Sequence, residues 1–342
     1  MAHHRLGIIG LGMAVTPHAK SLVDLEDRVE VAYAFSPSEA RRAAFAKSFP
    51  FPSCDRLETI LADKSIDAVA ILTPPNTHLE LVRQCAAAGK HILLEKPLDV
   101  STERAVALVE AAEKAGITLG VMLQHRFRPA GMRLREMLKA GELGKIVGCS
   151  TTIRLWRPQS YYDVEGRGTR ARDGGGVLIT QGIHTLDLML SLAGPISEVT
   201  SYAITSSVHR METEDMVAAA VRFANGALGT IDATTAAYPG FPERIDITGE
   251  TATAALAGTA LTVAHHDGRV TEIKADNSAG GTGADPMAFP HDYHLGIWTD
   301  FFDAIDRRRA PAVSGREALK VHRLIDALLE SGASGQRVKV KS

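Results

Sequence analysis

Along the first 125 residues, short runs of apolar residues alternate with longer segments of helical periodicity. The runs that indicate strands are Arg5–Ile9, Val29–Phe35, Ala68–Leu72, His91–Glu95 and Thr118–Leu123. The helical segments between them cover residues 15–25, 37–48, 56–62, 77–88 and 102–115. Strands that alternate with helices predict a parallel sheet, and the fixed hand of the crossover connections makes it doubly wound. In such a sheet, ligands bind at the carboxyl ends of the strands.

After residue 125 the pattern changes to longer strands separated by turn signals. Asn225-Gly226, between Met216–Phe223 and Leu228–Thr234, is a strong hairpin signal. Further strands are predicted near residues 145–154, 197–206, 243–249 and 261–273, and helices near 129–140, 291–307 and 315–332. Residues 277–286 are rich in Gly, Ala and Ser and are predicted to form a mobile loop. We therefore expect a second α/β domain with a large, mostly antiparallel open sheet, and domains at residues 1–125 and 126–342.

The composition of the 342-residue chain is that of an ordinary globular protein, with 45% hydrophobic and 23% charged residues. A formal net charge of −2 gives no electrostatic reason to expect a nucleic acid or an anionic membrane as partner. Cys54, Cys85 and Cys149 lie far apart in sequence, which fits neither a disulfide framework nor a zinc site. The first apolar stretch already ends in glycines, so we expect no signal peptide and a cytoplasmic location.

The strand at Leu6–Ile9 leads directly into a turn that begins at Gly10 and continues through Gly12. A dinucleotide pyrophosphate needs this order, because the first glycine allows a tight turn and the second lets the backbone approach the phosphates. The following helix supplies N–H groups at its N-terminus. The third position of the pattern is Val15 instead of Gly or Ala, and an ordinary turn would have the same short signature. The predicted cofactor-binding turn is Gly10, Gly12, Met13 and Ala14.

Three further segments, together with His18, resemble the Gfo/Idh/MocA oxidoreductase family, which includes glucose–fructose oxidoreductase and inositol dehydrogenases. These segments are Leu72–His78 (LTPPNTH), Glu95–Pro97 (EKP) and Gly174–His184 (GGGVLITQGIH). The resemblance covers essentially the whole chain. It implies a Rossmann domain, a nicotinamide cofactor, and oxidation or reduction of a hydroxyl or carbonyl carbon on a sugar or cyclitol. It also implies a second domain whose open sheet often forms the oligomer interface, so a homodimer or homotetramer is expected.

Hydride transfer at a carbon that bears a hydroxyl requires one proton to move at the oxygen. The sequence contains no metal-ligand cluster that would polarise this oxygen, so side chains must serve. Lys96 follows the apolar run His91–Leu94, where desolvation lowers a lysine pKa, and it matches the family's catalytic or substrate-binding lysine. His184 lies near the start of an apolar helix and titrates near neutrality. A surface lysine and a helix-packing histidine are the alternatives.

The chain departs from a common family pattern at Thr180, because many members place an aspartate four residues before this histidine. A threonine hydroxyl cannot act as a general base at neutral pH. A related group of sequences has a neutral residue there, followed by Gln-Gly and His, as in Gln181 to His184 here. Lys96 and His184 are therefore predicted to move the proton, with Thr180 as a hydrogen-bonding partner. Thr180 in place of the aspartate is also compatible with a weakly active enzyme or with a protein that has taken on another role.

The 2′ position of the cofactor is read at the end of the second strand, where NAD preference needs an acidic residue. The chain has Ser36 and Ser38 there, with Arg41 and Arg42 one helical turn on, which favours NADP(H) slightly over NAD(H) because these groups can bind a 2′-phosphate. The alternative is that the serines cap the next helix. Further cofactor contacts are predicted at Thr73, Pro74, Asn76, His78, Glu95 and Lys96, with Asn76 also capping the helix that follows it.

Arginines and tyrosines gather in the segments expected to face the substrate. They suit a polyhydroxylated or anionic ligand, although such clusters are also common at solvated surfaces and subunit contacts. The predicted substrate-binding residues are Lys96, Arg126, Arg157, Tyr161, Thr180 and His184. The same segments hold Arg128, Arg154, Tyr162, Arg167, Arg170 and Arg172. Asp187 is expected to orient His184 or cap its helix, and His294 to line the site or pack.

The leading interpretation is an NAD(P)-dependent oxidoreductase that acts on a sugar, cyclitol or related diol, with a small polyol or hydroxy acid as its partner. A second interpretation changes only the substrate, to a dihydrodiol or a dihydroxylated cyclic carboxylic acid whose carboxylate binds the arginines. A third, of another class, is a non-catalytic cofactor-binding sensor or scaffold, motivated by Thr180. No metal, nucleic acid or membrane is expected.

Overall fold

A computed structural model of the chain describes residues 3–275 and 290–341, so the predicted loop at 277–286 lies outside the described residues. The chain forms two compact units. The first contains residues 1–124 and 291–319, and the second contains residues 125–290 and 320–342. Among the described residues, no helix combines the length and the apolarity that crossing a bilayer requires.

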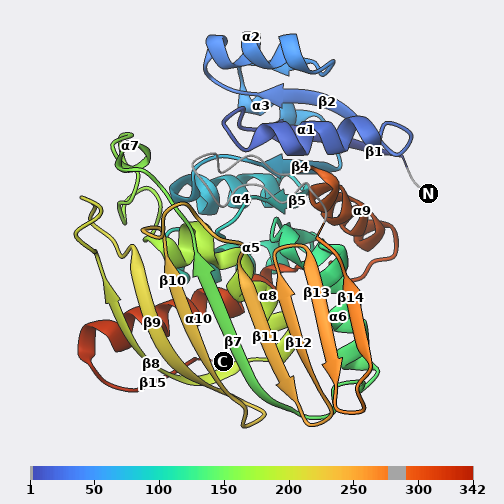
Figure 1. Cartoon of the computed structure of the whole chain (residues 1–342). Helices are drawn as coiled ribbons and strands as arrows, with labels where there is room; N and C mark the ends of the chain where they lie inside the picture. The colour runs from blue at the N-terminus through green and yellow to red at the C-terminus, as the bar shows by residue number, and fades with distance from the viewer. Residues whose placement is uncertain (1–2, 276–289, 342) are drawn as a thin grey trace. The chain divides into compact units, whose positions relative to one another are not determined.

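The first unit contains a six-stranded parallel sheet with the order β3-β2-β1-β4-β5-β6, of which Figure 1 labels β1, β2, β4 and β5. Its strands are β1 (His4–Ile9), β2 (Val29–Phe35), β3 (Ser53–Cys54), β4 (Ala68–Ile71), β5 (His91–Leu94) and β6 (Leu119–Val121). Its helices are α1 (Val15–Asp24), α2 (Glu39–Ser48), α3 (Leu57–Ala62), α4 (His78–Ala87), α5 (Thr102–Lys114) and α9 (Asp292–Asp306). The predicted doubly wound Rossmann sheet is confirmed.

The strand register places the segments that follow the central strands at one edge of this sheet. Ile9 pairs with Phe35 on one side and with Ile71 on the other, and Ile71 pairs with Leu94. The strands therefore end at the same level, and the glycine turn, Ser36, Thr73 and Glu95 all emerge there. The side chains of β4 are all buried, because helices cover both faces of a parallel sheet.

The predicted division gave every residue after 125 to the second domain, whereas the structure assigns residues 291–319 to the first unit. The physical reason is the apolar face of α9, which carries the fully buried side chains of Trp298, Phe301 and Phe302 and packs against α1. A single bridge between Gly120 and Ser314 then ties the chain after α9 to β6. A sequence pattern alone cannot show that a distant helix returns to the first sheet.

His4 joins β1 to α9 within the first unit. Its Nδ1 lies 2.8 Å from an Asp67 carboxylate oxygen, its Nε2 lies 3.1 Å from Asp306, and its ring stacks on Phe302 at 4.8 Å. The hydrogen bond to Asp67 and the negative charges of Asp67 and Asp306 raise the pKa of His4, although burial opposes them.

We expect the His4 contacts to make the first unit less stable as the pH rises. The folded-state pKa of His4 lies above the unfolded value of about 6.5, so the stabilisation is complete below that pH and is lost as the pH rises through the folded value. Urea unfolding followed across neutral pH measures this. His4→Gln should flatten the pH dependence, whereas the exposed His266→Gln should leave it unchanged; equal slopes in all three proteins would contradict the assignment.

The second unit contains a nine-stranded sheet with the order β14-β13-β12-β11-β7-β10-β9-β8-β15, in which only the β7–β10 pair is parallel. Its strands are β7 (Ile146–Arg154), β8 (Ile196–Ile204), β9 (Met216–Phe223), β10 (Leu228–Thr234), β11 (Arg244–Gly249), β12 (Ala252–Ala257), β13 (Ala260–His265), β14 (Val270–Ile273) and β15 (Val338–Lys339). This confirms the predicted mostly antiparallel open sheet.

The helices of the second unit are α6 (Pro129–Lys139), α7 (Gln159–Tyr162), α8 (Ile183–Ala193) and α10 (Gly315–Ser334), and the first turn of α10 belongs to the first unit. Helices α6 and α8 pack on one face of the sheet, and the other face is seen without a helix in Figure 1. The strand register places exposed apolar side chains on that open face, including Tyr202, Ile204 and Leu228. The predicted strand at 261–273 is two strands, β13 and β14, with a turn at Gly268.

Candidate active site

The turn after β1 brings two backbone segments into close approach. Gly10 has a φ of +108°, and a Cβ placed on it would lie 2.9 Å from the Leu72 carbonyl carbon and oxygen. Only glycine fits there without moving the chain. A Cβ on Gly12 would meet nothing within 4 Å, so the turn is open on that side, and Met13 is 54% exposed. No side chain caps the N-terminus of α1 at Ala14. An open glycine turn before an uncapped helix N-terminus fits a dinucleotide pyrophosphate.

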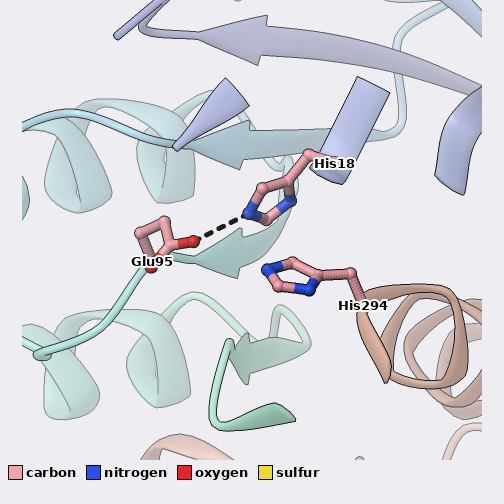
Figure 2. A group of neighbouring side chains, drawn as sticks. All are labelled: His18, Glu95 and His294. Atoms are coloured by element: carbon pink, nitrogen blue, oxygen red, sulfur yellow. Dashed lines mark hydrogen bonds and ion pairs between the residues drawn. The ribbon is translucent and has the colours of Figure 1, made fainter. Parts of the chain in front are cut away.

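Glu95, directly after β5, forms the centre of a buried cluster with His18 of α1 and His294 of α9 (Figure 2). One carboxylate oxygen lies 2.8 Å from His18 Nε2, and the other accepts a hydrogen bond of 3.0 Å from the backbone N–H of Lys96. Burial alone would raise the pKa of Glu95, but the hydrogen bond from His18 and the nearby positive charges lower it below its usual range. The cluster therefore keeps an anionic carboxylate directly beneath the Lys96 backbone.

His294 is the neutral member of this cluster. Burial, together with the smaller effect of His18, whose ring lies 5.1 Å away at a steep angle, lowers the pKa of His294 to about 3. The three side chains are of metal-ligating types, and their ligand atoms all lie within 4.8 Å of one another. The short contact between His18 and Glu95 already uses two of these atoms for each other. The sequence analysis missed this grouping because its members come from three distant segments.

Lys96 itself is half-buried and precedes Pro97 across a cis peptide bond. His78, predicted to contact the cofactor, is fully buried below this segment. Its Nδ1 lies 3.0 Å from the Pro97 carbonyl oxygen, and its Nε2 lies 2.9 Å from the Thr73 carbonyl oxygen. His78 thus braces the ends of β4 and β5 against each other, and its ring nitrogens face backbone rather than an open site.

The segment after β4 differs in one detail from the prediction. Thr73 and Pro74 precede a short 3₁₀ turn, Pro75–Thr77, which contains Asn76. The cap position of α4 is Thr77, without a side-chain hydrogen bond, so Asn76 does not cap this helix as predicted. The Asn76 carbonyl accepts a hydrogen bond from Arg104 instead.

The serines after β2 are engaged by their own loop. Ser36 is buried, and its hydroxyl accepts a 3.3 Å hydrogen bond from the Ser38 N–H. Ser38 is the N-cap of α2 and accepts from the Arg41 N–H, while the Arg42 guanidinium donates to the Ser36 carbonyl at 2.7 Å. These contacts match the capping alternative.

In the second unit, the glycine-rich segment before His184 is shaped by Glu214. Its carboxylate accepts hydrogen bonds from the backbone N–H groups of Gly176 and Leu178, and a Cβ on Gly176 would lie 1.7 Å from the Glu214 carbonyl oxygen. The chain then makes a π-helical turn, Leu178–Gly182, before α8 begins at Ile183. Such turns are rare and occur frequently at functional sites. This turn sets the position of Thr180 and delivers half-buried His184 at the start of α8.

A chain of polar contacts links this turn to the preceding loop. Thr180 donates to the Gly176 carbonyl at 2.6 Å and also contacts the Gln181 side chain. Gln181 donates to the Tyr161 hydroxyl at 3.4 Å, and Arg167 donates to the same hydroxyl at 2.7 Å. The neighbouring Tyr162 is buried, and its hydroxyl forms a hydrogen bond with Thr235. Tyr161 and Arg167 are half-buried.

Three other predicted residues, Arg126, Asp187 and Arg157, form contacts within the second unit. Arg126 and Asp187 form a buried pair with two parallel hydrogen bonds of 2.7 and 2.6 Å, and the role of Asp187 toward His184 stays a prediction. Arg157 is buried and donates to the Trp156 carbonyl at 2.7 Å. The ring that does lie against His184 is His125, stacked at 4.8 Å between centroids. Sequence reasoning missed His125, although it directly precedes the predicted Arg126.

The first unit has the parallel sheet of a dinucleotide-binding fold, and the second unit has an open, mostly antiparallel sheet. The chain belongs to the Gfo/Idh/MocA family. Residues 4–123 match the model of the oxidoreductase family with an NAD-binding Rossmann fold, and residues 132–255 match the model of its C-terminal domain. The predicted family is confirmed.

Several relatives are dehydrogenases. The chain is 28% identical to inositol 2-dehydrogenase of Rhizobium meliloti, covering 98% of this chain and 99% of the relative. It is 29% identical to scyllo-inositol 2-dehydrogenase (NAD(+)) of Bacillus subtilis over 72% of this chain and 71% of the relative. The solved structure of the WlbA dehydrogenase from Bordetella pertussis, in complex with NADH and UDP-GlcNAcA, is similar with a TM-score of 0.84 and 28% identity over 99% of each chain.

These comparisons correct the predicted cofactor. The preference for NADP(H) over NAD(H) is wrong, because the matching family model describes an NAD-binding fold and the similar WlbA structure carries NADH. The physical reason lies in the loop after β2, where the hydroxyls of Ser36 and Ser38 accept hydrogen bonds from backbone N–H groups and the Arg42 guanidinium donates to the Ser36 carbonyl. Serines at this position are typical both of a helix cap and of a phosphate-binding loop, and the sequence pattern alone does not distinguish these two roles.

Proposed function

We propose that the protein is an NAD-dependent dehydrogenase that transfers a hydride between the nicotinamide and a hydroxyl or carbonyl carbon of a sugar or cyclitol. The observation that carries the proposal is the Glu95 carboxylate at the carboxyl end of β5, which binds the backbone of Lys96 and is itself held by His18. A lysine at the ligand-binding edge of a doubly wound sheet, fixed by a buried anion, is positioned for chemistry rather than for solvation. The relatives' names support the class of substrate.

NAD, when bound, accepts or donates the hydride; the residues of the chain handle the proton. Lys96 is proposed to donate a hydrogen bond to the reacting oxygen, where its positive charge stabilises a developing alkoxide. His184 is proposed as the group that accepts or returns the proton. Thr180, with its hydroxyl already donated to the Gly176 carbonyl, keeps only acceptor capacity and is proposed as a substrate contact.

Thermal unfolding with each nicotinamide cofactor tests the cofactor half of the proposal. NADH at about 100 times its dissociation constant should stabilise the protein by roughly 2.7 kcal/mol, and NADPH at the same concentration should give a smaller shift. Gly10→Ala should abolish the NADH shift, because the added Cβ collides with Leu72. Gly89→Ala is the matched control, since Gly89 also has a positive φ but its Cβ would meet nothing within 4 Å. An unchanged unfolding temperature with NADH and NAD would contradict the proposal.

Three points stay predictions. They are the choice among sugar, cyclitol and diol substrates, the cytoplasmic location, and the assembly as a homodimer or homotetramer. Assays with myo-inositol, scyllo-inositol and aldoses address the first. Cell fractionation and light scattering of the purified protein address the other two.

A further inference from the structure

The arginines near the candidate substrate site are not equivalent. Five of them pair with a carboxylate within 4.0 Å: Arg126 with Asp187, Arg128 with Glu243, Arg154 with Asp232, Arg170 with Glu212 and Arg172 with Asp173. Arg157 donates to the backbone of its own loop. Arg167 differs from these five, because no carboxylate of the described residues lies within ion-pair distance of its guanidinium.

Arg167 is nevertheless held firmly. Its Nη1 donates a 2.7 Å hydrogen bond to the Tyr161 hydroxyl, and its guanidinium carbon lies 4.6 Å from the centre of the Tyr161 ring. The residue is flanked by Gly166 and Gly168, which both have positive φ, so the loop turns sharply on either side of it. Gly168 is fixed in turn by a hydrogen bond from its N–H to Asp173. The guanidinium is therefore presented in one orientation before any ligand arrives.

The same side chain belongs to the cluster around His184. The Tyr161 hydroxyl accepts one hydrogen bond from Arg167 and another from Gln181. Gln181 lies in the π-helical turn, three residues before His184. An anionic group bound by Arg167 would thus be placed beside the turn that positions the proposed proton acceptor. The guanidinium groups of the other six arginines contact a carboxylate or the backbone of this chain, so none of them matches Arg167 in this respect.

We propose that Arg167, oriented by Tyr161, binds a carboxylate on the substrate, so that the substrate class is a hydroxylated carboxylic acid such as a sugar acid or a cyclic polyhydroxy acid. The inference rests on the proposed dehydrogenase function. One edge of a guanidinium offers two parallel N–H donors that match the two oxygens of a carboxylate. A single positive charge also balances a carboxylate better than a phosphate of about −2. A half-buried guanidinium without a counter-ion is costly, and an anionic substrate restores the balance.

Matched acid and neutral probes test the proposal on the NADH-loaded protein. The pairs are D-glucuronate with D-glucose, D-galacturonate with D-galactose, and quinate with myo-inositol, each measured by calorimetric binding to that protein and, in a separate assay, by turnover with NAD⁺ as the hydride acceptor. At least one acid should bind more tightly than its neutral partner by about tenfold or more. Arg167→Met, which keeps the stem over Tyr161 but removes the charge, should weaken that acid by about 10- to 100-fold and leave the neutral probe within about threefold.

Two further variants keep the test decisive. Arg167→Lys retains the charge without the planar fork and should lose part of the preference. Arg170→Met is the control, because Arg170 is exposed and paired with Glu212, and it should behave as the wild type. The wild type and the three variants should have similar unfolding temperatures, which would establish that the substitutions leave the fold intact.

The outcomes separate this inference from the function on which it rests. Acid and neutral probes that bind equally, or an Arg167→Met variant that weakens both to the same degree, overturn the carboxylate assignment even where neutral sugars are oxidised. Binding of the acid that depends on Arg167, without turnover of any probe, supports the carboxylate site and counts against the dehydrogenase proposal.

Discussion

Lys96→Met should reduce the turnover number by about 10²- to 10⁴-fold while the affinity for NADH stays close to that of the wild type. The lost group is the one proposed to bind the reacting oxygen, and methionine preserves most of the volume of the lysine stem. The Glu95 carboxylate keeps its hydrogen bonds to His18 and to the backbone N–H at position 96, neither of which involves the replaced side chain. Initial rates of NADH formation and NADH fluorescence titration measure the two effects separately.

Lys64→Met serves as the control, because Lys64 is an exposed lysine of the same unit and should change neither quantity. A Lys96→Met enzyme with nearly wild-type turnover would remove Lys96 from the chemistry. A wild-type protein that binds NADH but turns over no sugar, cyclitol or diol, and whose response to NADH survives in the variant, would favour the sensor or scaffold interpretation.

The first unit could be predicted closely from the sequence because its signals are local. The buried runs Leu6–Ile9 in β1, Ala68–Ile71 in β4 and Ile92–Leu94 in β5 are short and apolar, as a parallel sheet covered on both faces requires. The common level of the strand ends then follows from the fold, so the gathering of Glu95, Thr73 and the glycine turn at one edge could be expected. β12 was missed because Ala252–Ala257 is a run of small residues with a weak strand pattern.

The partners within the site could not be predicted, because they are set by contacts between distant segments. His18 and Glu95 are 77 residues apart, and Arg126 and Asp187 are 61 apart. Each looks from the sequence like a free polar residue available to a ligand. Only the fold shows that Arg126 pairs with Asp187, and that Arg167, which had no distinguishing signal in the sequence, is held by Tyr161.

Asp187→Ala should destabilise the second unit by about 3–5 kcal/mol, because it leaves the Arg126 guanidinium buried without its counter-ion. Asp187 is 1% exposed and Arg126 is 7% exposed, and two charge-assisted hydrogen bonds of 2.6 and 2.7 Å join them. Equilibrium urea unfolding at neutral pH measures the loss. Asp232→Ala is the matched control, since the Asp232–Arg154 pair is exposed to solvent and should cost at most about 1 kcal/mol.

The double variant Arg126→Met/Asp187→Leu distinguishes the cost of an unpaired charge from the cost of a lost contact. Apolar side chains of similar volume remove both charges together, and replacing a buried ion pair in this way is often neutral or stabilising. The double variant should therefore recover most of the stability lost in Asp187→Ala. If it is as unstable as the single variant, the pair contributes through its hydrogen-bond geometry at the start of α8, and His184 would then be expected to lose its position as well, which the pH dependence of turnover would reveal.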